Sequence, residues 1–143
     1  MILRHVTLRR RLPKIVRDRC LNPDASTRKD SSDYGHISFE KEPINDVLVR
    51  IFPLIKSSCL EQFCDGDQYE LLFDGHKLLQ DGYKVETLGQ VREQLAGSVQ
   101  LGILTEKELK SLGDFVHIKG KVPLDYLLEE SKLRLRELGY ENV

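Results

Sequence analysis

The stretch from Tyr69 to Val91, YELLFDGHKLLQDGYKVETLGQV, constrains the fold more than any other part of this chain of 143 residues. An apolar run at 71–73 is followed by two Asp-Gly pairs, at 74–75 and 81–82. Asp-Gly between apolar residues is a strong hairpin signal, because glycine adopts a positive φ without steric cost. The stretch therefore predicts a strand, a tight turn, a second short strand, another turn and a buried turn at its end.

This order of features resembles the ubiquitin-like family, whose middle region carries an apolar triplet, a glycine turn, a short strand with leucine, an acidic-glycine turn and a buried turn. Here these features are Leu71-Leu72-Phe73, Gly75, Leu78, Asp81-Gly82 and Val85 to Val91. One extra residue lies between the two glycines. The resemblance implies an α+β fold, in which a ubiquitin-like β-grasp mixed sheet of four strands packs on one helix.

Other segments supply the remaining elements of such a fold. Residues 36–40 alternate polar and apolar side chains and predict a strand that ends at Glu42-Pro43. Asn45 is a suitable N-cap for a helix, whose interior Pro53 predicts a kink or a new helix start. The last strand of the sheet is predicted at 115–119, with Val116 and Ile118 pointing inward and His117 and Lys119 outward.

Two segments extend beyond the family pattern. In an insertion at 92–113, the residues from Gly97 onward predict a strand or an extended loop. Thr105 and Glu108 form a capping box that predicts a short inserted helix from Glu106 to Leu112. Pro123 opens a C-terminal helix that ends at Gly139. The predicted layout is a ubiquitin-like domain at 1–122, with a long first loop at 20–35, and a C-terminal helix at 123–143.

Composition narrows the classes of function. The formal net charge is −1, but residues 1–35 hold nine Lys or Arg against four Asp or Glu. Three cysteines, Cys20, Cys59 and Cys64, form a sparse, odd set that argues against a secreted disulfide scaffold. No apolar run is long enough to span a bilayer, so we expect no membrane span. No metal-ligand spacing, phosphate-binding glycine loop or catalytic motif is present, so the sequence predicts no enzyme, metal or cofactor.

The basic segment at the N-terminus has three interpretations. Residues 2–9 form the first strand of a ubiquitin-like sheet, with Val6 inward and His5 outward, although Arg4 breaks the alternation. Alternatively, residues 1–20 are a mitochondrial import peptide, because they are rich in arginine and poor in acids. In the third interpretation the segment binds nucleic-acid phosphates. The possible nucleic-acid contacts are then Arg9, Arg10, Arg11 and Lys14.

The resemblance implies a non-enzymatic ubiquitin-like protein-protein interaction module, an intracellular adaptor or subunit of a larger complex in the cytoplasm or nucleus. No small-molecule substrate is expected, and the absence of Gly-Gly argues against conjugation to other proteins. The predicted partner-binding residues are Leu72, His117, Lys119, Leu127, Leu128 and Leu135. Two alternatives remain open: a mitochondrial component of a ribosome or respiratory assembly, and an RNA-binding subunit of a ribonucleoprotein particle. The C-terminal helix packs either on its own domain or on a partner.

Overall fold

A computed structural model of the protein describes residues 1–23, 35–55, 66–87 and 91–143. The strands are β1 (Ile2–Leu8), β2 (Cys20–Leu21), β3 (His36–Lys41), β4 (Gln68–Asp74), β5 (Glu86–Thr87), β6 (Asp114–Lys119) and β7 (Val122–Pro123). The helices are α1 (Leu12–Asp18), α2 (Val47–Ile55), α3 (Gly75–Gln80), α4 (Val91–Gln100), α5 (Glu106–Ser111) and α6 (Glu129–Glu137), with 3-10 turns η1 (Arg9–Arg11) and η4 (Leu124–Tyr126). The predicted α+β class is confirmed.

A five-stranded sheet in the order β4-β1-β3-β6-β5 forms the centre of the molecule, and a small sheet pairs β2 with β7. Neighbouring strands are antiparallel in every pairing within the described part of the chain, so the predicted mixed sheet of four strands is wrong. Because β1 lies inside the sheet, both of its faces are covered, and Leu3, Arg4, Thr7 and Leu8 are all buried. Residues 1–20 therefore belong to the folded domain, with part of them buried in its core.

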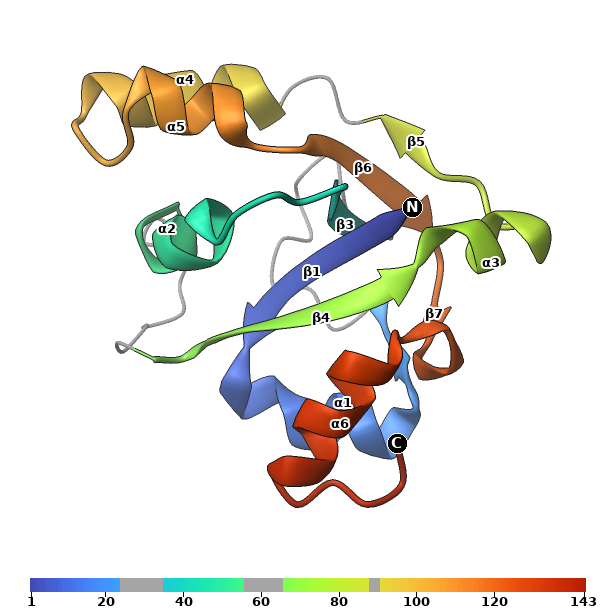
Figure 1. Ribbon diagram of the computed structural model, residues 1–143. Coiled ribbons are helices and arrows are strands. Elements are labelled where there is room, and N and C mark those ends of the chain that lie inside the picture. The colour runs from blue at the N-terminus through green and yellow to red at the C-terminus, as the bar shows by residue number, and fades with distance from the viewer. Residues whose placement is uncertain (24–34, 56–65, 88–90) are drawn as a thin grey trace.

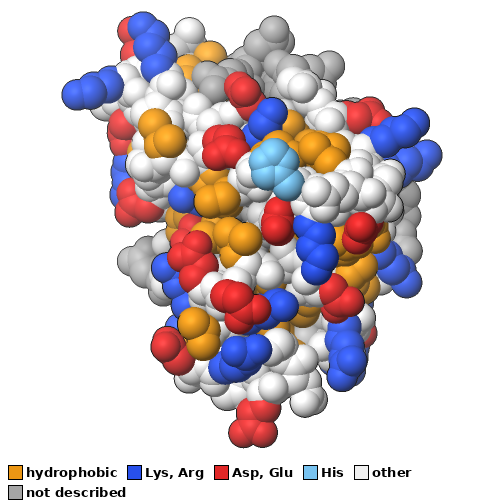
Figure 2. Space-filling view, turned by 45° about the vertical axis from the view of Figure 1, so that its right-hand side comes forward, with side chains coloured by type: hydrophobic (Ala, Val, Ile, Leu, Met, Phe, Trp, Pro, Cys, Tyr) orange, Lys and Arg blue, Asp and Glu red, His pale blue; other side chains and the backbone are white. Residues whose placement is uncertain are grey.

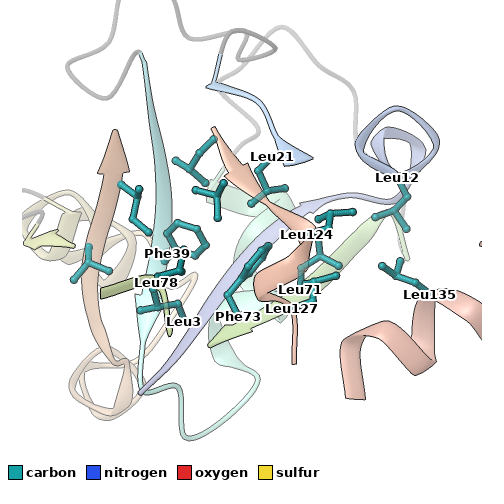
Figure 3. Packing of buried hydrophobic residues seen from close by; sticks show 14 residues of the cluster. Leu3, Leu12, Leu21, Phe39, Leu71, Phe73, Leu78, Leu124, Leu127 and Leu135 are labelled. Atoms are coloured by element: carbon teal, nitrogen blue, oxygen red, sulfur yellow. The ribbon is translucent and has the colours of Figure 1, made fainter. Parts of the chain in front are cut away.

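Hydrophobic clusters cover the two faces of the sheet at its opposite ends. One cluster joins Leu3, Phe39 and Phe73 of the sheet to Leu12 of α1 and Leu135 of α6 (Figure 3). The other, on the opposite face, packs α2, α4 and α5 against β6. Its buried members are Val47, Ile51, Leu95, Leu104, Leu112 and Phe115. In Figure 1 the helices α2, α4 and α5 accordingly lie at one end of the sheet, and α1 and α6 lie at the other.

The first Asp-Gly pair is a helix start and not a hairpin turn, so the predicted short strand at Leu78 is wrong. The Asp74 side chain accepts a hydrogen bond from the Lys77 amide at 3.1 Å and caps α3. Glycine suits this position because a Cβ at Gly75 would lie 3.0 Å from the backbone oxygen of Met1. Gly82, in the second pair, has φ +95° after the end of α3, as a turn glycine does. The predicted buried turn runs from Val85 to Val91, and its residues 88–90 lie outside the described part of the chain.

The capping predictions are confirmed, but one predicted extended segment is helical. Asn45 accepts from the Val47 amide at 3.0 Å at the start of α2. The capping box of α5 has both of its hydrogen bonds, between Thr105 and Glu108. The segment from Gly97 belongs to α4 as far as Gln100, and α2 continues across Pro53. No helix in the described ranges is long and apolar enough to cross a membrane.

The C-terminal segment covers the outer edge of the sheet. The single predicted helix at 123–139 is instead β7, η4 and α6. The Leu128 amide donates to the Leu72 carbonyl at 2.8 Å, and the Leu72 amide donates to Ser131 Oγ at 2.9 Å. These bonds satisfy the free edge of β4, which would otherwise be open to pairing with another chain. The segment therefore packs on its own domain.

Candidate functional site

The central sheet is divided between β1 and β3. Strand β1 pairs with β4 from Ile2 to Leu8, and β3 pairs with β6 along its whole length. Between β1 and β3, in contrast, the described register contains only Leu3 with Lys41 and Arg4 with Glu40. The two halves of the sheet are thus joined at one end and separate beyond it. We call this separation the β1–β3 split.

His5 lies where the two strands begin to separate, and its side chain replaces a backbone hydrogen bond. Its Nδ1 is 2.8 Å from the Ser38 carbonyl oxygen, and its ring centroid lies 5.6 Å from that of Phe39. A carbonyl oxygen can only accept, so Nδ1 carries the hydrogen and Nε2 of the neutral ring is an acceptor. The half-buried imidazole is therefore held in one orientation and one tautomer, as a binding or catalytic histidine must be.

A buried ion pair closes the joined end of the split. Arg4 Nη1 lies 2.8 Å from Glu40 Oε1, and Arg4 Nη2 donates to the Asn45 carbonyl at 2.6 Å. The Gly113 amide donates to the other oxygen, Glu40 Oε2, at 2.9 Å. Burial raises the pKa of Glu40, while the Gly113 hydrogen bond and the Arg4 charge act in the opposite direction. Because both oxygens are occupied and the side chain is buried, Glu40 has a structural role.

Asp114, at the start of β6, is an exposed acidic residue on the same face of the sheet as His5. Asp114 pairs with Lys41, and Lys41 pairs with Leu3, so all three share one face. Side chains two residues apart along a strand point the same way, which places His5 on this face as well. A strand rises about 3.3 Å per residue and neighbouring strands lie about 4.8 Å apart, so the Cα atoms of His5 and Asp114 lie about 12 Å apart. Strand β3 lies between them, and its Phe39 and Lys41 are on the same face.

The opposite face carries a pair of histidines. The His36 and His117 ring centroids are 4.3 Å apart, and both Nδ1 atoms are buried without a hydrogen-bond partner among the described residues. His117 Nε2 lies 3.5 Å from Glu86 Oε2 on β5. Nevertheless, no group of three or more His, Cys, Asp or Glu in the described ranges is arranged to hold a metal ion.

One small pocket lies elsewhere on the described surface. A pocket of about 90 Å³ lies between the start of β2 and the C-terminus, and its lining includes Arg19, Asp125 and Lys132. Sites for small molecules usually measure about 300–1,000 Å³, so this pocket is smaller than a usual ligand site. On the face shown in Figure 2, acidic and basic side chains are interspersed. We take the β1–β3 split as the candidate site because the strands stop pairing there beside the oriented His5.

The predicted partner-binding residues do not form one exposed surface. Leu72, Leu127 and Leu135 are buried in the described structure, Leu128 and His117 are half-buried, and Lys119 is exposed. Leu72 is on β4, and β1 and β3 separate it from His117 and Lys119 on β6. The three leucines pack in the core because α6 and the segment before it cover the sheet edge.

The possible nucleic-acid contacts lie together after β1. Arg9, Arg10 and Lys14 are exposed and Arg11 is half-buried, in η1 and the start of α1. Sequence reasoning assigned no function to His5 or Asp114. One signal in the sequence was Arg4. It breaks the alternation of polar and apolar residues in the first strand, which indicates a charge buried inside the sheet. Of the cysteines weighed as metal ligands, Cys59 and Cys64 lie outside the described residues.

No family model matches the sequence, and no curated protein matches it. Among solved structures, DarT from Thermus sp. 2.9 in complex with carba-NAD+ superposes with a TM-score of 0.59 at 13% identity, covering 99% of this chain and 89% of that chain. The same DarT with NAD+ gives a TM-score of 0.59 at 12% identity, again covering 99% and 89%. DarT with ADP-ribosylated ssDNA gives 0.58 at 11%, covering 99% and 88%.

These matches correct several predictions from the sequence. The ubiquitin-like β-grasp is wrong, because the likeness to DarT extends over nearly the whole chain. The prediction of a non-enzymatic adaptor or subunit, with its mitochondrial and RNA-binding alternatives, is contradicted as well, and so is that of no small-molecule substrate. Proteins of this fold were solved with NAD+ and with ADP-ribosylated ssDNA. The chain has the fold of the DarT structures.

Proposed function

We propose that this protein is an enzyme that transfers ADP-ribose from NAD+ to single-stranded DNA, with the reaction centre in the β1–β3 split. The observation that carries the proposal is the likeness to the DarT complexes over 99% of the chain. The local geometry supports it, since the sheet opens beside an oriented histidine and an acidic residue shares the face of that histidine.

The chemistry of the transfer sets requirements that these residues can meet. The bond between ribose C1′ and the nicotinamide nitrogen breaks, and its electron pair neutralises the positive ring. A nucleophilic atom of the DNA then bonds to C1′ and loses its proton. Positive charge develops on the ribose during this exchange, as in glycoside hydrolysis, so a nearby carboxylate lowers the barrier.

We assign His5 to binding and Asp114 to the reacting centre. The His5 imidazole is oriented by the Ser38 carbonyl and lies next to the Phe39 ring, so it is placed to contact the ribose of NAD+. The Asp114 carboxylate, on the same face and level with the joined end of the split, stabilises the cationic ribose or accepts the proton that the DNA loses. Glu40 is excluded from this role because Arg4 and Gly113 already hold it.

The test is the turnover of NAD+ in the presence of a single-stranded oligonucleotide. Chromatography should detect free nicotinamide, and mass spectrometry should detect oligonucleotide that carries ADP-ribose. Asp114→Asn should lower the rate about 10²-fold or more, as expected for the loss of an electrostatic stabiliser. His5→Ala should mainly weaken NAD+ binding, which titration calorimetry measures.

Matched controls separate these roles from general effects of substitution. His76→Ala on α3 and Asp125→Asn on η4 remove an exposed histidine and an exposed carboxylate away from the split. Both controls should retain wild-type turnover and NAD+ affinity. Wild-type protein that releases no nicotinamide with any single-stranded oligonucleotide, and does not bind NAD+, would refute the proposal.

A further inference from the structure

A cluster of basic side chains follows directly from the strand that carries His5. The cluster, which we call the η1 patch, consists of Arg9, Arg10, Arg11 and Lys14. Residues 1–17 contain no Asp or Glu, and the one other cation before Arg17 is the buried Arg4. The remainder of the chain is acidic overall, because the full sequence has a formal net charge of −1. The η1 patch therefore concentrates positive charge in one place.

The position of the patch relative to the split matters as much as its charge. Arg9 comes four residues after His5 along β1, which corresponds to about 13 Å between their Cα atoms. The Arg9 amide donates to the Asp67 carbonyl at 2.5 Å, which ties the start of η1 to the chain entering β4. The patch is thus held at a fixed distance from the split, one that a few nucleotides of an extended strand can span.

An aromatic side chain borders the patch on β4. Tyr69 pairs with Thr7, two residues before Arg9. Burial raises the pKa of Tyr69, the positive charges of Arg134 and Arg9 lower it, and the negative charges of Glu137 and Glu70 raise it, so charges of both signs act on its hydroxyl. Tyr69 is half-buried, and its hydroxyl has no hydrogen-bond partner among the described residues. The Tyr69 ring packs against the main hydrophobic cluster. On surfaces that bind single strands, the phosphates pair with the cations.

We propose that the η1 patch binds the phosphodiester backbone of the single-stranded DNA whose base is modified at the β1–β3 split. This inference rests on the proposed function, because the split must be the reaction centre for the patch to have this role. The patch would keep the strand next to the split while its reactive base is aligned with the ribose. Phosphate contacts of this kind supply affinity and register but no sequence preference.

The test is binding of a fluorescein-labelled oligothymidylate of twelve nucleotides, followed by fluorescence anisotropy over a range of KCl concentrations. Each phosphate contact with a single strand contributes about 0.7 to the slope of log K against log salt. The variant R9Q/R10Q/R11Q/K14Q should therefore lose up to about 3 units of slope and on the order of tenfold or more in affinity at low salt. The single variant Lys14→Gln, at an exposed side chain, should lose about 0.7 units of slope.

The matched control is K107Q/K110Q, which removes two exposed lysines from α5, at the opposite end of the molecule from α1 (Figure 1). It should bind the oligonucleotide like the wild type. NAD+ affinity of every variant, measured by calorimetry, distinguishes the two proposals. If the patch variants bind both NAD+ and DNA like the wild type, the inference is overturned and the proposed function stands. If the wild type binds neither ligand, both fail.

Discussion

The neighbours of a single side chain determine its orientation and the contacts that it can make. His5 is oriented by the Ser38 carbonyl, and Glu40 is held by Arg4 and by the Gly113 amide. The first arrangement fixes the orientation of the imidazole, whereas the second gives both carboxylate oxygens a partner. His5 therefore has a role in binding, and Glu40 has a role in joining the halves of the sheet.

Glu40 should make stability depend on pH. Because burial raises its pKa above the ordinary value of 4.5, the folded state binds more protons than the unfolded state between 4.5 and the raised pKa. The free energy of unfolding should therefore fall as pH rises through that interval, and Glu40→Gln should lack this component. Urea denaturation of both proteins from pH 4 to pH 8 measures the difference. Glu106→Gln, at an exposed carboxyl group, is the control, and a difference between wild type and Glu40→Gln that does not vary with pH would contradict the account.

Gly113 should tolerate no side chain. A Cβ there would lie 2.1 Å from the Lys41 carbonyl oxygen, a backbone atom that moves only if β3 moves. Gly113→Ala should lower the free energy of unfolding by about 1–3 kcal/mol, the usual cost of overpacking. Gly97→Ala, where a Cβ would contact nothing within 4 Å, is the matched control for thermal unfolding. Equal melting temperatures for the two variants would show that the close approach is not rigid.

At the scale of the element, α6 is a part of the core and not a free recognition helix. Leu135 is fully buried in the same cluster as Phe73 and Leu12, whereas Leu133 is 54% exposed. Leu135→Ala should therefore cost about 2–5 kcal/mol of unfolding free energy, and Leu133→Ala should cost much less. Chemical denaturation measures both. A Leu135→Ala protein as stable as the wild type would mean that α6 does not pack on its own domain.

Individual elements could be predicted where the signal is local. The capping box at Thr105, the cap at Asn45 and the alternation in β6 each depend on a few neighbouring residues, and the structure confirms them. The Asp74-Gly75 pair was misread because its glycine serves a close approach of Met1, a contact between distant parts of the chain. An Asp before a glycine fits a helix cap as well as a turn, so the pair alone did not decide between them.

The candidate site could not be predicted because it arises from strand order. The split depends on where β1 stops pairing with β3, and Asp114 shares a face with His5 only through the pairing of three strands. Neither fact follows from residues close together in the sequence. The basic residues of the η1 patch were visible from the start, since a run of charge is a local property.

At the scale of the whole molecule, the fold consists of two half-sheets with helices at both ends. The β4–β1 half carries His5 and leads into the η1 patch, and the β3–β6–β5 half carries Asp114. Arg4 and Glu40 hold the halves together at one end. A ligand in the split contacts both halves, so its binding should stabilise the folded protein by mass action.

The most direct test of this account is a titration with NAD+ followed by nuclear magnetic resonance of backbone amides and histidine side chains. The account predicts shifts concentrated at His5, Ser38, Phe39 and Asp114, together with a higher melting temperature in the presence of NAD+. The His76 imidazole on α3 should not shift. Shifts confined to the His36–His117 pair or to the pocket at Arg19, or no shifts at all, would contradict the placement of NAD+ in the β1–β3 split.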